Sequence, residues 1–308
     1  MNSREKLKVR LGINTGFATN RFPEPEEWIR LVKEDFGLKY VQFTADLLNP
    51  SLPDNIIKSQ VNKIKKNLSK YDVKVEHAFT SSYTRVNHLA HPDKKIQKYW
   101  INWFKKFADI SRQLGAVSFG SHLGILSIAD YKDNSRREAR FKDLMKNWKE
   151  VASYAKKVGF KYVTWEPMSI AREFGETISE TKRLQKILND EFPIPMKLCL
   201  DVDHGDVASK NTNDKNPYEW IRMFGKEAPF IHIKQSLKDK GGHWPFTPEY
   251  NKRGIIFPDK IIKSIRESGA KDILLLLELS FREREPFESG VIGDIKDSVE
   301  FWKPYVTC

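Results

Sequence analysis

A short apolar run meets a cluster of ionisable groups in KLCLDVDHGD, Lys197–Asp206. Lys197–Val202 has the length and composition of a buried strand. The C-terminal end of this run is crowded by Asp201, Asp203, His204 and Asp206. Removing unpaired carboxylates from water is costly unless a cation or hydrogen-bond donors compensate them. The stretch therefore predicts a cation site at the end of a buried strand, and the competing interpretation is a loop with solvated capping side chains.

Eight apolar or β-branched runs recur along the chain, each followed by a longer stretch of helical periodicity. The predicted strands are Val9–Asn14, Tyr40–Thr44, Lys74–Phe79, Ala116–Gly120, Tyr162–Trp165, Lys197–Leu200, Phe230–Ile233 and Ile273–Leu277. The predicted helices are Glu26–Asp35, Asn55–Ser69, Lys94–Gln113, Arg136–Lys157, Glu180–Leu188, Tyr218–Phe224, Pro258–Glu267 and Ile295–Trp302.

This strict alternation predicts an α/β fold, with a parallel sheet whose nearly continuous apolar strands are covered by helices. Eight strand–helix units in 308 residues fit a single (β/α)8 TIM barrel that spans residues 1–308. In such a barrel the active site lies at the C-terminal ends of the strands. A doubly wound open sheet is the alternative, but neither a GxGxxG nor a P-loop motif follows the first strand.

Cysteine usage bears on the compartment. The two cysteines, Cys199 and Cys308, form neither a disulfide framework nor a CxxC metal motif, which indicates a reducing environment. We therefore expect a cytoplasmic protein. The first residues lack the apolar core of a signal peptide, and the longest apolar run, Ile273–Leu277, is too short to span a bilayer, so we expect no membrane association.

The chain is basic, with 53 lysines and arginines against 41 aspartates and glutamates, a formal charge of +12 and a pI near 9.4. Such a charge raises the question of an anionic partner: nucleic acid, a membrane surface or a phosphorylated metabolite. Much of the excess lies at helical spacing, in Lys58, Lys63, Lys65, Lys66, Lys70, Lys94, Lys95, Lys98, Lys105 and Lys106. We interpret these lysines as solvated helix faces, which argues against nucleic acid as a partner.

Ionisable side chains gather where the predicted strands end: His77, His122, Glu166, Asp201, His204, His232 and Glu278. Taken singly, each histidine is better explained as a hydrogen-bonded core residue. Glu166, Asp201, His232 and Glu278, however, come from four neighbouring strands and would converge on one point of a barrel. Three carboxylates and one imidazole suit one divalent cation, Mn²⁺, Mg²⁺ or Co²⁺, with Zn²⁺ as a further candidate.

Four motifs carry a resemblance to a known family. TWEPMS around Glu166, LDVDH around Asp201, HIKQS around His232 and LELS around Glu278 resemble the metal-binding strand ends of the xylose isomerase-like TIM barrels, in particular the ketose 3-epimerases. The resemblance extends strand by strand over nearly the whole chain. Longer stretches resemble the tetrulose-phosphate branch, the D-erythrulose 1-phosphate 3-epimerase type: INTGFATNRFPEPEEW, QFTADLLNP, FTSSYTRVNHLAHPD, EPMSIAREFGET and KQSLKDKGGHWPFT.

The resemblance implies that Glu166, Asp201, His232 and Glu278 bind one divalent cation and that His204 contacts the substrate. Related epimerases place an arginine six residues after the metal histidine, where this chain has Lys238. We also expect a homo-oligomer, a dimer or a tetramer.

The chemistry of epimerisation agrees with these roles. Inversion of a carbon next to a carbonyl requires removal of a proton from one face and return of a proton to the other. Glu166 and Glu278 are the predicted pair of opposed bases, the cation would stabilise a cis-enediolate, and His204 would donate to the developing oxyanion. An aldose–ketose isomerase can use the same groups, and a free ketose is an alternative substrate.

The loop after the seventh predicted strand, residues 234–243, is rich in groups that bind a phosphate dianion. It offers ammonium groups, a hydroxyl and backbone amides, from Lys234, Ser236, Lys238, Lys240, Gly241 and Gly242. Arg85 and His88 are further phosphate candidates, and His122 is a candidate substrate contact. These residues predict a small sugar phosphate as the substrate, and a mobile surface loop without a ligand is the alternative.

The main competing class is a trinuclear-zinc apurinic endonuclease of the TIM-barrel type, in which His77 and His122 would be additional zinc ligands. That family carries an Asp-x-His pair in the loop after the seventh strand, whereas here Asp239 and His243 are separated by three residues. A non-catalytic sugar-binding barrel would keep four converging ligands without using them. We therefore favour the epimerase.

Overall fold

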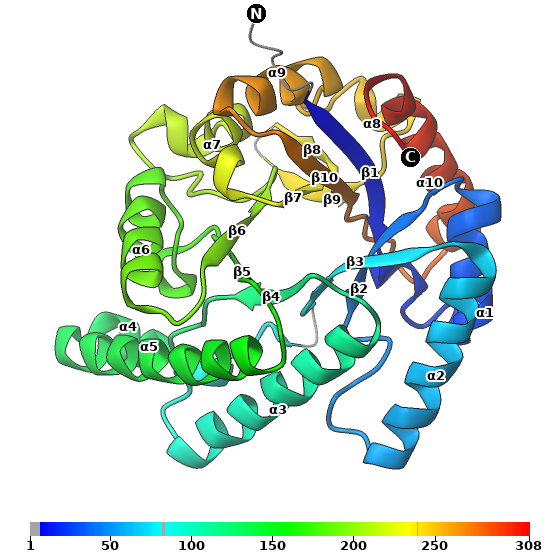
Figure 1. Ribbon diagram of the computed structural model, residues 1–308. Coiled ribbons are helices and arrows are strands. Elements are labelled where there is room, and N and C mark those ends of the chain that lie inside the picture. The colour runs from blue at the N-terminus through cyan, green and yellow to red at the C-terminus, as the bar shows by residue number, and fades with distance from the viewer. Residues whose placement is uncertain (1–6, 82–83, 239) are drawn as a thin grey trace, which may run out of the picture.

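Eight parallel strands close into a barrel in the computed structural model, which describes residues 7–81, 84–238 and 240–308 (Figure 1). Strand β10 pairs with β1 from Lys8–Asp272 to Ile13–Leu277 and so closes the sheet. The barrel strands are β1 Lys8–Asn14, β2 Tyr40–Thr44, β3 Lys74–Phe79, β4 Ser118–His122, β5 Val163–Glu166, β6 Met196–Asp201, β7 Phe230–Ile233 and β10 Asp272–Leu277. The predicted (β/α)8 barrel is confirmed.

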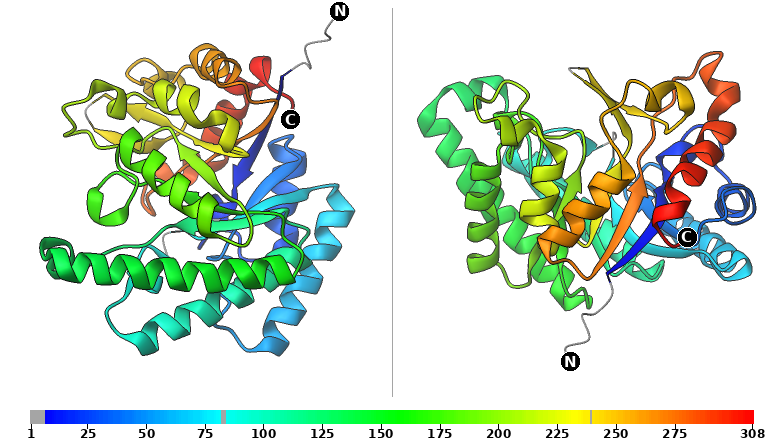
Figure 2. Two further views of the ribbon diagram at one scale, coloured as in Figure 1. Left: turned by 60° about the vertical axis from the view of Figure 1, so that its left-hand side comes forward. Right: turned by 90° about the horizontal axis from the view of Figure 1, so that it is seen from above.

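Helices connect the strands and cover the outside of the barrel (Figures 1 and 2). Two of them end where a left-handed residue reverses the chain, α2 at Asp72 and α9 at Gly269. The helices are α1 Pro25–Arg30, α2 Asp54–Tyr71, α3 Lys94–Gln113, α4 Ile128–Lys132, α5 Asn134–Lys157, α6 Ile178–Glu191, α7 Pro217–Phe224, α8 Pro248–Asn251, α9 Pro258–Ser268 and α10 Phe287–Trp302. All eight predicted helices are present, and α10 begins eight residues earlier than predicted.

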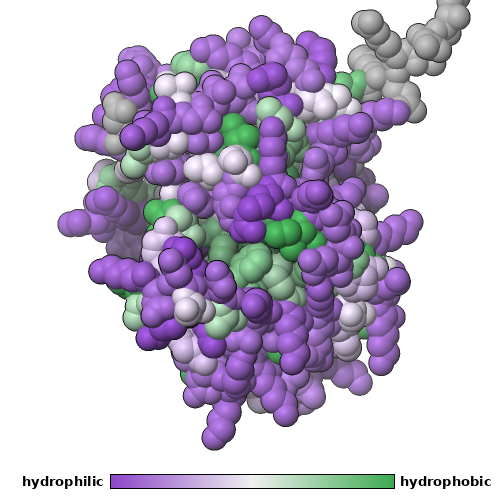
Figure 3. Space-filling model, turned by 90° about the vertical axis from the view of Figure 1, so that its left-hand side faces the viewer, coloured by the Kyte–Doolittle hydropathy of each residue, from purple (hydrophilic) through white to green (hydrophobic). Residues whose placement is uncertain are grey.

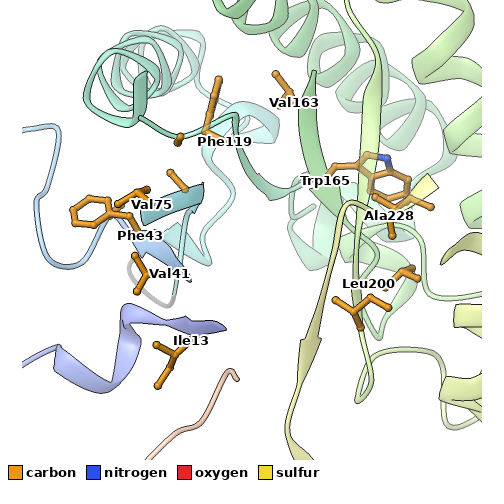
Figure 4. Packing of buried hydrophobic residues seen from close by; sticks show 14 of the residues in the cluster. Ile13, Val41, Phe43, Val75, Phe119, Val163, Trp165, Leu200 and Ala228 are labelled. Carbon is orange, nitrogen blue, oxygen red and sulfur yellow. The ribbon is translucent and has the colours of Figure 1, made fainter. Parts of the chain in front are cut away.

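Apolar side chains pack on both faces of the barrel wall. Figure 4 shows part of the outer layer, which lies between the strands and the helices and includes Val41, Phe119 and Trp165. The layer inside the barrel consists of Phe79, Cys199, Phe230, Leu274 and Leu276. Successive residues of a strand point to opposite faces, so one strand supplies both layers, and this explains why the strands are apolar throughout.

The inner layer positions the functional groups. Asp201, His232 and Glu278 follow the inner-layer residues Cys199, Phe230 and Leu276 by two positions each. A step of two residues keeps a side chain on the same face of a strand, so these three groups form the next layer toward the C-terminal end of the barrel. The convergence predicted from the strand ends follows from this geometry.

The surface is mostly hydrophilic on the face shown in Figure 3. The ten lysines interpreted as solvated helix faces lie on α2 and α3, and all are exposed except Lys105, which is half-buried. Among the helices of the described chain, none combines the length and the apolar character that crossing a membrane requires.

A two-stranded hairpin replaces most of the loop that was predicted after the seventh strand. Strand β8, Gln235–Leu237, pairs antiparallel with β9, Gly241–Trp244. The right-hand view of Figure 2 shows the hairpin, in yellow, at the end of the barrel away from the start of β1. Gly241 and Gly242 have φ values of 60° and 120°, which residues other than glycine rarely adopt.

An ion-pair network lies at the N-terminal ends of the strands, opposite the hairpin. The Arg10 guanidinium is 3.0 Å from Glu76 Oε1 and 3.0 Å from Asp272 Oδ1, and it lies 4.8 Å from the centre of the Tyr40 ring. These contacts join β1 to β3 and β10. Because the Arg10 side chain is nearly buried, the network closes this end of the barrel.

Candidate active site

A cavity of about 390 Å³ opens at the C-terminal ends of the strands, where the barrel fold predicts an active site. Residues at or just after several strand ends line it, among them Asn14, Thr80, His122, Glu166, His204 and Glu278. Its volume lies within the range that holds small ligands.

The four predicted metal ligands meet at the floor of this cavity. His232 Nδ1 is 3.0 Å from Glu166 Oε1, 3.4 Å from Glu278 Oε1 and 3.7 Å from Asp201 Oδ2. The ligand atoms of Asp201, His232 and Glu278 all lie within 4.8 Å of one another, and so do those of Glu166, Asp201 and His204. A divalent cation bound by nitrogen and oxygen at about 2.0–2.2 Å fits among donor atoms with this spacing.

Hydrogen bonds on the side of His232 that faces away from the carboxylates fix the orientation of its ring. Its Nε2 is 2.8 Å from Gln42 Oε1, which also accepts a hydrogen bond from Asn14 Nδ2 at 2.8 Å. Because an amide oxygen only accepts, Nε2 carries a proton. Nδ1 faces the three carboxylates. Burial opposes a charge on the ring, yet the charges of Glu278 and Asp201 help to raise the pKa of His232 well above its ordinary value, so without a metal Nδ1 is protonated as well. A metal would take the place of this Nδ1 proton. The residues present therefore fit one divalent cation held by Glu166, Asp201, His232 and Glu278.

Electrostatics keep the carboxylates of the cluster ionised. Burial disfavours the charge of Asp201, yet the positive charges of His204 and Lys234 hold its pKa well below the ordinary value. Burial likewise opposes the charge of Glu278, whose pKa is nonetheless lowered by His232, Lys234 and His243. Ionised carboxylates are the form that binds a metal.

Lys234 lies among the candidate metal ligands and not in the loop predicted to bind phosphate. Its side chain is fully buried, and the ammonium donates to Asp201 Oδ2 and, at 2.7 Å, to Glu278 Oε2. Lys234 follows His232 by two residues, and this step keeps its side chain on the inward face of the barrel and not in the predicted loop. Lys234 does not line the cavity in the described structure.

The remaining donors of the predicted phosphate loop are also placed elsewhere. The Ser236 hydroxyl donates to Asp203 Oδ1, and the Gly242 N–H donates to Asp203 Oδ2 at 2.8 Å. Lys238 and Lys240 are exposed and do not line the cavity, and Asp239 lies outside the described residues. In this structure Asp203, a carboxylate of the chain itself, thus accepts from the Ser236 hydroxyl and the Gly242 amide of the predicted phosphate-binding loop.

Arg85 is the cation best placed for an anionic substrate. The cavity lining of the described residues contains two side chains of the arginine and lysine type, Arg21 and Arg85. Arg21 is committed to Glu288, at 2.7 Å, and to the Phe281 carbonyl. Among the described residues Arg85 pairs with Glu173 Oε2, at 3.1 Å, and its side chain is 53% exposed.

His204 lines the cavity, as its predicted role requires. Its Nδ1 is 2.9 Å from the Pro167 carbonyl, which can only accept, so Nδ1 carries a proton. Nε2 is 3.9 Å from Asp201 Oδ2. Donation from Nε2 to a substrate oxyanion therefore requires the imidazolium form.

The other candidate histidines have different surroundings. His122 lines the cavity. The His88 ring stacks on the His122 ring, with 4.3 Å between the ring centres. His88 is fully buried and is not among the described residues that line the cavity. His77 lies inside the barrel, where Nδ1 is 2.8 Å from Ser118 Oγ and burial lowers its pKa to about 3. Neither His77 nor His122 belongs to a metal-ligand cluster of the described residues. The additional zinc ligands of the endonuclease class are not assembled here.

Gln42 and Cys199 belong to the site although no role was predicted for them, and the contacts of Asp203 and His243 differ from those predicted. Cys199 Sγ lies 3.5 Å from His232 Nδ1, and His243 Nδ1 lies 3.5 Å from Glu278 Oε2. A signal was available for Gln42, since a polar residue in the apolar strand YVQFT has to find a buried partner.

Comparison with known proteins places this geometry in a family. Residues 29–305 match the family model described as Xylose isomerase-like TIM barrel. The chain belongs to the xylose isomerase-like TIM barrel family. The resemblance inferred from the strand-end motifs is confirmed.

Within the xylose isomerase-like family, the chain is 44% identical over 301 residues to the D-erythrulose 1-phosphate 3-epimerase of Brucella abortus (strain 2308), with 97% of each chain covered. Its structure resembles a putative xylose isomerase from Rhodospirillum rubrum, with a TM-score of 0.85, 25% identity and coverage of 96% and 99%. A D-psicose 3-epimerase from Clostridium cellulolyticum H10 gives a TM-score of 0.69, 14% identity and coverage of 97% and 100%. This last similarity concerns the fold alone.

Proposed function

We propose that the protein is a metal-dependent 3-epimerase of a short phosphorylated ketose, a tetrulose or pentulose phosphate. The observation that carries the proposal is that Glu166 and Glu278 line one cavity while both face His232. The 44% identity to a D-erythrulose 1-phosphate 3-epimerase supports the substrate class.

The proposed reaction exchanges one proton at C3. One glutamate, as a carboxylate, removes the C3 proton, and the electron pair of the broken C–H bond forms the C2–C3 double bond of an enediolate, with the charge on the former carbonyl oxygen. The other glutamate, which has taken a proton from water for this step, gives that proton to C3 on the opposite face, and proton exchange with water then restores both glutamates. A bound divalent cation supplies stabilisation of the negative charge on the enediolate oxygens. Nε2 of protonated His204 donates to the same charge.

The proposed phosphate contact is Arg85. A phosphate dianion requires a cation with free N–H donors. Arg85 lines the cavity, and among the described residues its guanidinium pairs with Glu173 while about half of its side chain stays exposed. Its partner Glu173 also contacts Arg172, at 3.4 Å, so its charge stays compensated when Arg85 turns toward a ligand.

The direct test is epimerisation in D₂O. Protein stripped with EDTA and reloaded with Mn²⁺, Co²⁺ or Mg²⁺ is incubated with D-erythrulose 1-phosphate, and the product is followed by NMR. The expected result is activity only with metal and deuterium at C3. The phosphate on O1 prevents an aldose from forming from this ketose, so conversion of the ketose 4-phosphate to an aldose with deuterium at C2 would instead indicate an isomerase. Full activity without metal would contradict the proposed mechanism.

Substitution of Arg85 tests the phosphate assignment. Arg85→Met should lower kcat/KM for the phosphorylated ketose by about 10- to 150-fold, because one charge-assisted hydrogen bond contributes about 1.5–3 kcal/mol. Activity on the unphosphorylated ketose should hardly change. Lys238→Met, on the exposed hairpin turn, is the control and should leave both activities intact. An equal loss for both substrates in Arg85→Met would refute the contact.

A further inference from the structure

Lys234 is a fully buried cation in a site whose other charged side chains are carboxylates and histidines. Its side chain is 0% exposed, as is that of Asp201, to which it donates. Its second partner is Glu278 Oε2 at 2.7 Å. Burying an ammonium group is costly unless paired charges compensate it, so these two carboxylates hold Lys234 in place.

The partners of Lys234 are two of the four groups that would hold the divalent cation. Glu166, Asp201 and Glu278 bring three negative charges to one point, and Lys234 neutralises one of them. Asp201 uses the same atom, Oδ2, toward Lys234 and toward His232 Nδ1. A divalent cation at this point therefore meets carboxylates that already have a positive partner, and the two cations repel each other.

From this arrangement we propose that the Lys234 ammonium and the divalent cation compete for the carboxylates of Asp201 and Glu278. Lys234 is the internal counter-ion of the metal-free site: it keeps the ligands together without a metal and lowers the affinity for the metal. Lys234 positions the carboxylates of Asp201 and Glu278. Because it lowers the affinity for the metal, the bound ion can exchange with ions in solution. The inference rests on the metal site of the proposed function and is independent of the substrate.

The test compares metal affinity in Lys234→Met with the parent protein by calorimetric titration of Mn²⁺ into EDTA-stripped protein. Removing a positive charge that shares two carboxylates with the metal should tighten Mn²⁺ binding by about tenfold or more. The melting temperature of the metal-free variant should fall, and added Mn²⁺ should raise it by more than in the parent. Unchanged or weaker Mn²⁺ binding in Lys234→Met would overturn the proposal.

Two controls separate competition from damage to the fold. Lys234→Arg keeps the positive charge and should show no gain in affinity, whereas Lys238→Met removes a lysine from the exposed part of the same hairpin and should behave as the parent. Tighter binding in Lys238→Met as well would attribute the effect to net charge and refute the role of Lys234.

The same titrations distinguish this proposal from the proposed function. Mn²⁺ binding to Lys234→Met but not to the parent would support the competition even if the parent lacked epimerase activity. Absence of binding to both proteins would refute the metal site and the competition together.

Discussion

At the scale of single residues, the two glutamates of the cavity have different partners. Glu278 Oε2 is bonded to Lys234, while its Oε1 faces His232 at 3.4 Å. Glu166 Oε1 faces His232 at 3.0 Å and Cys199 Sγ at 3.8 Å. The two proposed bases thus have different surroundings, which makes their roles separable by substitution.

Glutamine at either position should lower kcat by about 10²- to 10⁴-fold, the usual contribution of a positioned base. A variant with one base can still remove the C3 proton from the epimer that presents it to that base. We therefore expect Glu166→Gln and Glu278→Gln to catalyse deuterium exchange in opposite epimers, without epimerisation. Loss of exchange from the same epimer in both variants would argue against two opposed bases. Circular dichroism and melting curves verify that each variant is folded.

At the scale of elements, the hairpin β8–β9 depends on one carboxylate from another part of the barrel. Asp203, two residues after β6, accepts hydrogen bonds from Ser236 in β8 and Gly242 in β9. His243, which follows Gly242, lines the cavity and lies 3.3 Å from the Glu278 carbonyl. Asp203 therefore holds one wall of the cavity through the hairpin.

Asp203→Ala should loosen this wall. The loss of two hydrogen bonds to a charged acceptor should raise KM by about tenfold with little change in kcat, because the substrate then has to order the hairpin. Amide hydrogen exchange at Gly242 should accelerate in parallel. Asp206→Ala is the matched control, since Asp206 bonds within its own loop, to the Ala208 N–H. Unchanged exchange at Gly242 would show that the hairpin does not depend on Asp203.

At the scale of the whole molecule, buried histidines connect pH to stability. Burial lowers the pKa of His77 to about 3 and also lowers the pKa of His88 and His122. In the unfolded chain these groups titrate near 6.5, so the folded state binds fewer protons. Their contribution to stability is complete above about pH 6.5 and is lost as the pH falls toward 3. For His77 alone the loss amounts to about 4–5 kcal/mol.

His77→Asn should reduce this acid sensitivity. Between pH 7.5 and pH 5, the free energy of unfolding of the variant should fall by about 2 kcal/mol less than that of the parent, because one titrating group is removed. Urea unfolding at the two pH values measures the difference. If the free energy of unfolding changed equally with pH in both proteins, His77 would not be the source of this acid sensitivity.

Local patterns were sufficient to predict the barrel and the convergence of Glu166, Asp201, His232 and Glu278 on one point. An apolar strand followed by a polar end is a short-range signal, and barrel closure then brings the ends of β5, β6, β7 and β10 together. The positions of Lys234 and Ser236 could not be predicted in this way. Each depends on a carboxylate from another strand or loop, Asp201 and Asp203, and no local pattern encodes such a partner.

The ion pairs of Arg10 have a consequence for how this protein can change over generations. They bind β1 to β3 and β10 at the end of the barrel opposite the cavity. Mutations of residues that line the cavity lie on the other rim and leave this closure untouched. The barrel can therefore stay folded when mutations at the cavity end lower its stability. Laboratory evolution of the substrate range should keep Arg10, Glu76 and Asp272 fixed.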